Sequence, residues 1–166
     1  MTGEQWRAWA ARITVVVATV VVVVALTRLW SFATTDDPTV VEQGAIARTA
    51  ATACAQMREA TAAAAVASTA PIPQRVGAIN AQNDSVTALI TTMGQLSAER
   101  LQADQPAAEW VQDWQRLVSA RDTYARSLAA GKPKPLALPT LDGRGLVDRL
   151  NDVGLNCRVP LVLLAP

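Results

Sequence analysis

Few residues of this chain could do chemistry, because it contains no histidine. Histidine is the commonest general base and the commonest metal ligand in proteins. The sequence also has no nucleophile elbow, no metalloprotease helix motif and no phosphate-binding loop. We therefore expect no catalytic residue, no metal site and no cofactor, and predict that the protein is not an enzyme.

Carboxylates are the remaining candidates for catalysis. Two acidic side chains facing each other across a cleft would suit glycoside hydrolysis. Nothing in their spacing selects such a pair, and most lie on helix faces that water would cover. A carboxylate hydrolase is therefore the least favoured hypothesis. The acidic candidates are Glu42, Glu59, Asp84, Glu99, Glu109, Asp113, Asp122, Asp148 and Asp152.

Three residues of one predicted helix are candidates for contact with a ligand or partner. Trp110 and Trp114 lie one turn apart and could stack on a sugar or grip a partner, although this spacing is more typical of core packing. Arg121 interrupts the apolar wall of the same helix and could bind a carboxylate or phosphate. Alternatively, Arg121 reaches solvent past Trp114 or pairs with a carboxylate of a neighbouring helix. We favour the structural interpretation for all three.

A short basic segment, Lys132-Pro133-Lys134-Pro135, follows this helix. It could be a polyproline-type docking segment or a contact for anionic envelope polymers. A solvated, proline-stiffened linker is the simpler interpretation. Such a linker is long enough to return along the helix that precedes it.

A nearly unbroken apolar run from Ile13 to Trp30 organises the rest of the chain. It has about 18 residues, or roughly 27 Å of helix, close to the ~30 Å thickness of a bilayer core. Arg7 and Arg12 precede it and Asp36 follows it, so the distribution of basic residues predicts a cytoplasmic N-terminus. We predict a single-pass membrane anchor in the lipid bilayer.

A cleavable signal peptide is the alternative. Ser31-Phe32-Ala33 has the small-x-small form of a cleavage site, and cleavage near Ala33 would make the protein secreted. In either case the chain from about Thr34 onward is expected to be extracytoplasmic. The predicted organisation is therefore a cytoplasmic segment 1–12, a transmembrane helix 13–30, a linker 31–38 and an extracytoplasmic helical domain 39–166.

The two cysteines, Cys54 and Cys157, both lie in the exported part, where disulfides persist. We predict a disulfide between them, joining the first exported helix to the C-terminal tail. Two unlinked buried thiols are the alternative. The formal charge of the 166-residue chain is +1, which gives no general reason to expect a nucleic-acid partner.

Hydrophobic periodicity predicts an all-α bundle of about four helices. The first begins at Thr39, in the capping box Thr39-Val40-Val41-Glu42, and continues to about Ser68. Its buried face is expected to contain Ile46, Ala50, Ala53, Cys54, Met57, Thr61 and Ala64.

The other predicted helices follow in order. The second spans 74–103, with polar residues between Asn80 and Ser85 that weaken its middle. The third runs from Pro106 to a stop at Gly131, and a proline-rich linker follows it. The fourth spans 142–153, and the apolar tail after Cys157 is expected to pack on the first helix.

The C-terminal sequence Gly154-Leu155-Asn156-Cys157-Arg158-Val159-Pro160, preceded by a short helix, carries a family resemblance. It resembles small exported helical proteins of high-GC actinobacteria that end in a Cys-x-Val-Pro element. The resemblance covers about the last third of the chain. It implies an envelope protein without an assigned activity, and it gives no catalytic residue.

These observations favour a membrane-anchored envelope protein whose helical domain is a structural or protein-interaction module, with another envelope protein as the expected partner. The alternative is an exported module that binds a small or amphipathic ligand near Trp110, Trp114 and Arg121. That alternative requires a pocket beside these residues.

Overall fold

The computed structural model describes residues 17–27 and 40–165. The chain divides into two units, residues 1–37 and 38–166. The predicted cytoplasmic segment, the cleavage site near Ala33, the linker 31–38 and the start of the capping box at Thr39 lie outside the described residues.

Residues 17–27 of the first unit form a helix with exposed valine side chains. The Thr27 hydroxyl donates to the carbonyls of Val23 and Val24, which satisfies it within the helix. In the described ranges 17–27 and 40–165, no helix is both long enough and apolar enough to cross a membrane. Residues 13–16 and 28–30 of the predicted span lie outside those ranges.

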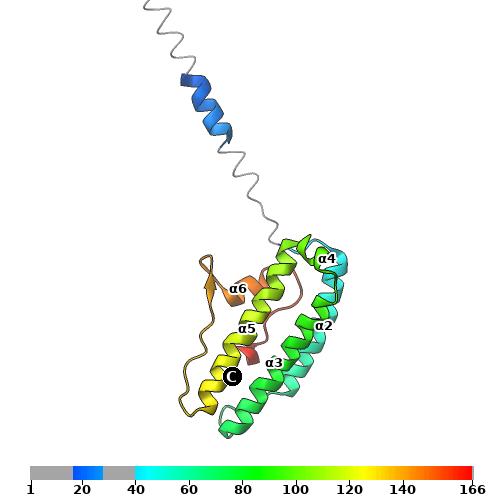
Figure 1. Ribbon diagram of the computed structural model, residues 1–166, viewed down its shortest axis with the longest axis vertical. Coiled ribbons are helices and arrows are strands. Elements are labelled where there is room, and N and C mark those ends of the chain that lie inside the picture. Colours follow the sequence, from blue (N-terminus) through cyan, green and yellow to red (C-terminus); the bar gives the residue numbers. More distant parts are fainter. Residues whose placement is uncertain (1–16, 28–39, 166) are drawn as a thin grey trace, which may run out of the picture. The chain divides into compact units, whose positions relative to one another are not determined.

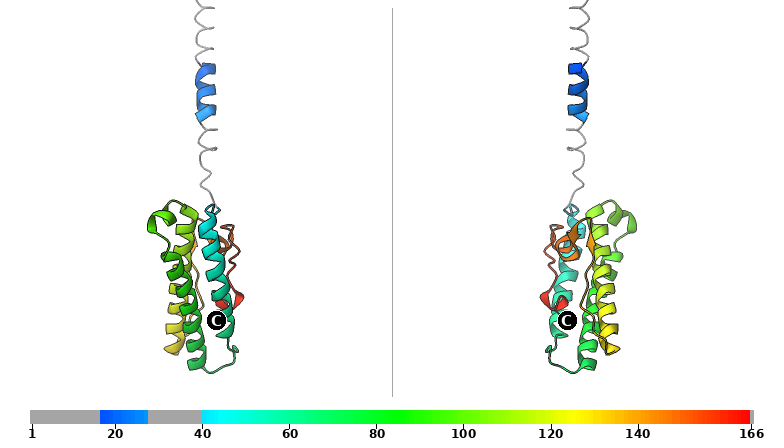
Figure 2. Two further views of the ribbon diagram at one scale, coloured as in Figure 1. Left: turned by 90° about the vertical axis from the view of Figure 1, so that its right-hand side faces the viewer. Right: turned by 90° about the vertical axis from the view of Figure 1, so that its left-hand side faces the viewer.

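The second unit is built on three long helices (Figure 1). They are α2 (Gly44–Ala63), α3 (Ile72–Gly94) and α5 (Gln105–Ala129). Helix α3 packs extensively against both α2 and α5. The three lie side by side along their lengths, as the views in Figure 2 also show.

The periodicity predicted the buried face of α2 well. Helix α2 buries the expected stripe, with Ala64 as its C-cap. The buried side chains of α2 are Ile46, Ala50, Ala53, Cys54, Met57 and Thr61. The buried apolar side chains of α3 are Ile79, Val86, Leu89 and Met93. The apolar core of α5 includes Trp110, Trp114, Leu117, Ala125 and Leu128.

The fourth position of the bundle is not filled by a fourth long helix. Helix α6 (Leu146–Asn151) is short, and the chain then continues in an irregular segment to the 3-10 turn η1 (Leu161–Leu163). Gly154 has a φ of +73°, and Pro160 has no backbone N–H, so the segment does not continue as a helix. Buried Leu155, Val159 and Leu163 supply the core contacts that a helix would have made.

The start of the first long helix differs from the prediction. Helix α2 begins at Gly44, and its N-cap Gln43 makes no side-chain cap hydrogen bond. The N–H groups of Glu42 and Gln43 instead donate to Asp104 Oδ2, at 3.2 and 3.0 Å. The predicted capping box is therefore wrong as a helix start, because a carboxylate distant in sequence satisfies these donors.

The second predicted helix is divided, but not at its polar middle. Helix α3 continues through residues 80–85 and ends at Gly94, and the short α4 (Ala98–Gln102) follows. Ser97 caps α4 by accepting from Arg100 N. Residues 80–85 do not break the helix because two of their side chains have buried partners, described below.

The third predicted helix is confirmed almost to the residue. Pro106 lies in the first turn of α5, where its missing N–H costs no hydrogen bond. At the other end Gly131 adopts a φ of +67°. Gly131 N donates to Leu128 O and Lys132 N to Ser127 O, the two bonds of a Schellman motif.

A small hairpin precedes α6, and its residues 142–145 were predicted to belong to the fourth helix, 142–153. Strands β1 (Thr140–Leu141) and β2 (Arg144–Gly145) are antiparallel, with Leu141 opposite Arg144. Asp142 and Gly143 join them with φ of 52° and 76°, the positive values that a type I′ turn needs. The fold is therefore mostly helical rather than all-α.

Gly154 lies where the C-terminal segment packs closely against the chain that precedes α2. Val41 N donates to Val153 O at 3.0 Å, which brings the chain before α2 against this segment. A Cβ at Gly154 would lie 2.3 Å from Val40 Cγ1. We therefore expect Gly154→Ala to lower the free energy of unfolding by roughly 1–3 kcal/mol, measured by urea denaturation.

Gly77→Ala is the matched control. Gly77 lies inside α3, and a Cβ there would meet no atom within 4 Å. Replacing a helical glycine by alanine should raise the free energy of unfolding by about 0.5–1 kcal/mol. Equal effects of the two substitutions would contradict the described fit of Gly154.

Candidate functional site

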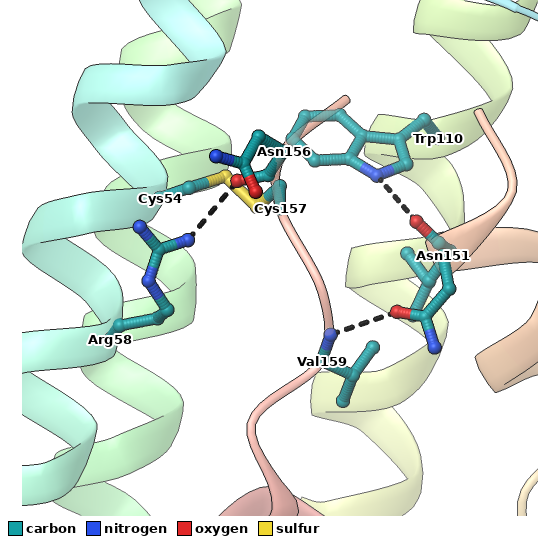
Figure 3. The surroundings of a disulfide bond; sticks show 8 residues. Cys54, Arg58, Trp110, Asn151, Asn156, Cys157 and Val159 are labelled. Atoms are coloured by element: carbon teal, nitrogen blue, oxygen red, sulfur yellow. Dashed lines mark hydrogen bonds between the residues drawn. A yellow bond between two sulfur atoms is a disulfide. The ribbon is translucent and has the colours of Figure 1, made fainter. Parts of the chain in front are cut away.

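A disulfide joins Cys54 of α2 to Cys157 of the C-terminal segment, as the sequence predicted (Figure 3). The two Cα atoms are 5.6 Å apart, within the usual range for a bridge. The cysteines are 103 positions apart in the sequence, so the bond closes most of the second unit into one loop. In the chain-entropy model a loop of this size stabilises by about 4–5 kcal/mol.

Three hydrogen bonds hold the chain on either side of this bridge. Figure 3 shows Arg58 of α2 donating to Asn156 O at 3.2 Å, next to the cysteine. Val159 N donates to Asn151 Oδ1 at 2.9 Å. Trp110 Nε1 donates to Leu150 O, in the last turn of α6, at 3.2 Å. The tail is therefore fixed to α2 and α6, and α6 is fixed to α5.

Trp110 and Trp114 belong to the core. Both side chains have 0% exposure, and their rings meet edge to face with centroids 5.9 Å apart. This geometry is favourable for aromatic pairs. Within residues 17–27 and 40–165 the Trp114 indole nitrogen has no hydrogen-bond partner, so Trp114 contributes by packing whereas Trp110 also anchors α6. A ligand could reach either ring only if the core opened.

Arg121 is also wholly buried, with 0% exposure. Its guanidinium donates to Asn83 Oδ1 at 2.7 Å and to Gln82 Oε1 at 2.5 Å, both on α3. It also donates to the carbonyl of Leu163 in η1. A single α5 side chain therefore connects α3, α5 and the C-terminal turn.

The charge of Arg121 is offset by dipoles and by one carboxylate in its surroundings. Burial lowers the pKa of Arg121 to about 10, and the nearby Asp122 carboxylate opposes this shift. Asn83 Nδ2 donates to Asp122 Oδ1 at 2.6 Å, so the amide bridges arginine and carboxylate. At neutral pH the guanidinium is protonated in both the folded and unfolded chain.

The buried role of Gln82 and Asn83 was not predicted from the sequence. Both amides are buried, with exposures of 3% and 4%. The polar pattern predicts only that residues between Asn80 and Ser85 weaken the second helix, although Gln82 and Asn83 both fall on its inward face. The signal was the coincidence of inward amides on one helix with an arginine in the apolar face of the next.

A second polar cluster holds α6 on α5. Arg149 Nε lies 2.9 Å from Asp113 Oδ2, and its Nη2 lies 3.1 Å from Glu109 Oε2. Arg116 Nη1 contacts the other carboxylate oxygen, Asp113 Oδ1, at 2.5 Å. Asp113 is therefore shared by two guanidinium groups. These carboxylates are engaged in ion pairs that connect elements.

A groove of about 360 Å³ lies between α5 and the extended segment 134–139. It uses a face of α5 other than the one that carries Trp110 and Trp114. Its α5 side includes Arg116, Ser119 and Thr123, and its other side includes Lys134. Figure 1 shows this segment returning along α5 after the helix ends. The groove is thus an open space bordered by α5.

Comparisons with protein-family models, with curated proteins and with solved structures found no match to this chain. The resemblance of the Cys157-Arg158-Val159-Pro160 element to exported actinobacterial proteins therefore stays a prediction.

Removing the disulfide should destabilise the second unit strongly. We expect the double variant Cys54→Ala/Cys157→Ala to lose about 2–5 kcal/mol of unfolding free energy, because the unfolded chain regains the freedom of a long loop. Urea denaturation measures the loss. Reductant should lower the unfolding free energy of the parent protein to nearly that of the variant, and it should leave the unfolding free energy of the variant unchanged. A reductant-insensitive parent would contradict the bridge.

Replacing Arg121 tests the polar connection among α3, α5 and η1. Arg121→Met keeps much of the side-chain volume but leaves Gln82, Asn83 and Leu163 O without their donor. We expect a loss of roughly 2–4 kcal/mol in unfolding free energy. Arg126→Met on the same helix is the control, since Arg126 is exposed and its one bond to a described residue is to Thr123 Oγ1. That control should change stability by less than about 0.5 kcal/mol.

Proposed function

We propose that this chain is a membrane-anchored cell-envelope protein whose residues 39–166 form an extracytoplasmic helical module for protein interaction, without catalysis. The Cys54–Cys157 disulfide is the observation that carries the proposal. Disulfides persist in oxidising compartments and are rare in the cytosol. The apolar run from Ile13 to Trp30 supplies the anchor, and the basic residues before it orient the N-terminus toward the cytoplasm.

The interior of the second unit supports an interaction role. The side chains with the strongest potential for ligand contact, Trp110, Trp114 and Arg121, are committed to core packing and to internal hydrogen bonds. The bridge and the polar connections fix the surfaces of α2, α3 and α5 relative to one another. A rigid, preorganised surface lowers the entropic cost of binding a partner.

Topology is tested in membranes of the source organism. We expect externally added protease to digest the second unit of the full chain in intact spheroplasts. We also expect its cysteines to resist alkylation until reductant is added, and the intact mass to equal that of all 166 residues. Alkylation without reductant, or protection from external protease, would contradict an extracytoplasmic domain. Loss of about 33 residues would replace the anchor by a cleaved signal peptide.

The interaction role is tested by photo-crosslinking from defined surface positions. A photoreactive residue replaces Ala55 on α2, Ala88 on α3 or Ala137 beside α5, all of them exposed. At least one position should give a discrete adduct of defined mass in native membranes, and the others should give less. If no position gives an adduct while the protein remains folded, the interaction role is wrong.

A further inference from the structure

The segment 132–135, with the sequence Lys-Pro-Lys-Pro, has a backbone whose shape is set by its own residues. A proline ring holds φ at about −65°, and the residue before a proline is restricted to extended or polyproline II conformations. Both lysines precede prolines, and the described part of the chain contains no cis peptide bond. The four residues therefore favour a polyproline II helix about 12 Å long. We call them the lysine–proline ridge.

The backbone donors of the ridge are all used or absent. Lys132 N donates to Ser127 O at 3.0 Å, and Lys134 N donates to Ser127 Oγ at 3.1 Å, so one residue of α5 holds both lysines. The two prolines have no N–H. A partner therefore cannot add a strand that pairs with N–H groups of the ridge, and recognition must use its side chains and carbonyls.

All four residues of the ridge are exposed, and its charge is not neutralised nearby. The two lysines and Arg126 lie in the stretch 123–141, which contains no Asp or Glu. None of the ion pairs among residues 17–27 and 40–165 involves these three cations. Asp122, the next carboxylate along the chain, is bonded to Asn83 of α3. The C-terminal dipole of α5, equivalent to about half a negative charge, offsets only part of this positive charge.

We propose that the lysine–proline ridge docks in a groove of a partner protein that is lined by aromatic side chains and bordered by carboxylates. The inference rests on the proposed interaction function and names the partner chemistry. Aromatic-lined grooves recognise polyproline II segments because the ligand is already ordered before it binds. The ridge meets this condition inside a folded domain, so it loses less entropy on binding than a free linker would.

Lys132 and Pro135 together suit such a groove. A polyproline II helix has three residues per turn, so these two residues share one edge of it. The proline ring can pack on an aromatic ring, while the lysine reaches a bordering carboxylate or the face of a second ring. A polyanion would use the lysines but not the prolines. The alternating sequence therefore favours a protein groove over an anionic polymer or a lipid surface.

The test uses the full-length protein in its native membranes, at expression levels below saturation of the partner. A photoreactive residue replaces Ala130 or Ala137, the exposed alanines on either side of the ridge. We expect both positions to give one discrete adduct that protease digests. Mass spectrometry should place the cross-link on the partner beside exposed tryptophan or tyrosine and beside Asp or Glu.

Synthetic peptides then compete for this adduct. The first has the sequence of residues 131–136, Gly-Lys-Pro-Lys-Pro-Leu. The second has alanine in place of both prolines, and the third has glutamine in place of both lysines. We expect the second and third to need roughly 10-fold higher concentrations than the first to halve the adduct yield. The second loses the ordered backbone, and the third loses the charges.

Variants of the full chain make the same comparison. The double variants Pro133→Ala/Pro135→Ala and Lys132→Gln/Lys134→Gln should each lower the adduct yield by roughly 5–10-fold. The first keeps the charges of the ridge and the second keeps its prolines, so the proposal requires that both lose the adduct.

Two matched controls lie outside the ridge. Pro73→Ala removes an exposed proline of α3, and Arg48→Gln removes an exposed cation of α2. Each should change the adduct yield by less than about 2-fold, as expected for surface substitutions away from the contact. Circular dichroism and urea denaturation establish that every variant is folded.

Three results would overturn the inference. The first is equal competition by the alanine-substituted peptide, which would reduce recognition to charge. The second is an adduct that resists protease, which would assign the ridge to a glycan or a lipid. The third is cross-linking from Ala55 or Ala88 without any from the two positions beside the ridge, which would leave the interaction function standing. Absence of adducts from every position would contradict the inference and the interaction function together.

Discussion

Burial of the Arg121 charge is the constraint on which the rest of the second unit depends. A guanidinium removed from water requires several well-placed acceptors, or its desolvation outweighs what it contributes. Gln82, Asn83 and the Leu163 carbonyl supply them from two other elements, and Asp122 lies behind Asn83. The register of α3 on α5 and the position of η1 are therefore coupled through one side chain. A shift of either element would leave polar groups buried without partners.

The disulfide and the hydrogen bond from Arg121 to Leu163 O both hold the C-terminal segment, the first to α2 and the second to α5. Cys157 is bonded to α2, while Leu163 accepts from α5, so an irregular tail occupies the place of a fourth helix. Few hydrogen bonds within the tail could hold it there alone, because it lacks a helical ladder. Covalent attachment and a buried charge replace that ladder. This division explains why an alanine-rich helix such as α2, with small side chains on its buried face, still forms part of a fixed core.

Local patterns in the sequence predicted much of this fold. The buried stripe of α2 and the ends of α5 followed from periodicity, Pro106 and Gly131, since these signals act within a few residues. The disulfide followed from the number and position of the cysteines. The hairpin was missed although Asp142-Gly143 is a strong turn signal. Asp104 and Gln82 could not be assigned, because their partners are far away in the sequence. The groove beside α5 depends on where the linker returns, which the residue pattern alone does not specify.

Trp110, Trp114 and Arg121 are used inside the core, so the account depends on how firmly the C-terminal segment is held there. The most direct test of this account is amide hydrogen exchange across the C-terminal segment of the oxidised protein. Cys157, Val159 and Leu163 donate their N–H groups to Leu155 O, Asn151 Oδ1 and Pro160 O, respectively. The account predicts that these amides exchange as slowly as those in the middle of α5, because both open only on global unfolding. Exchange at the rate of an unstructured peptide would show that the tail is not part of the core.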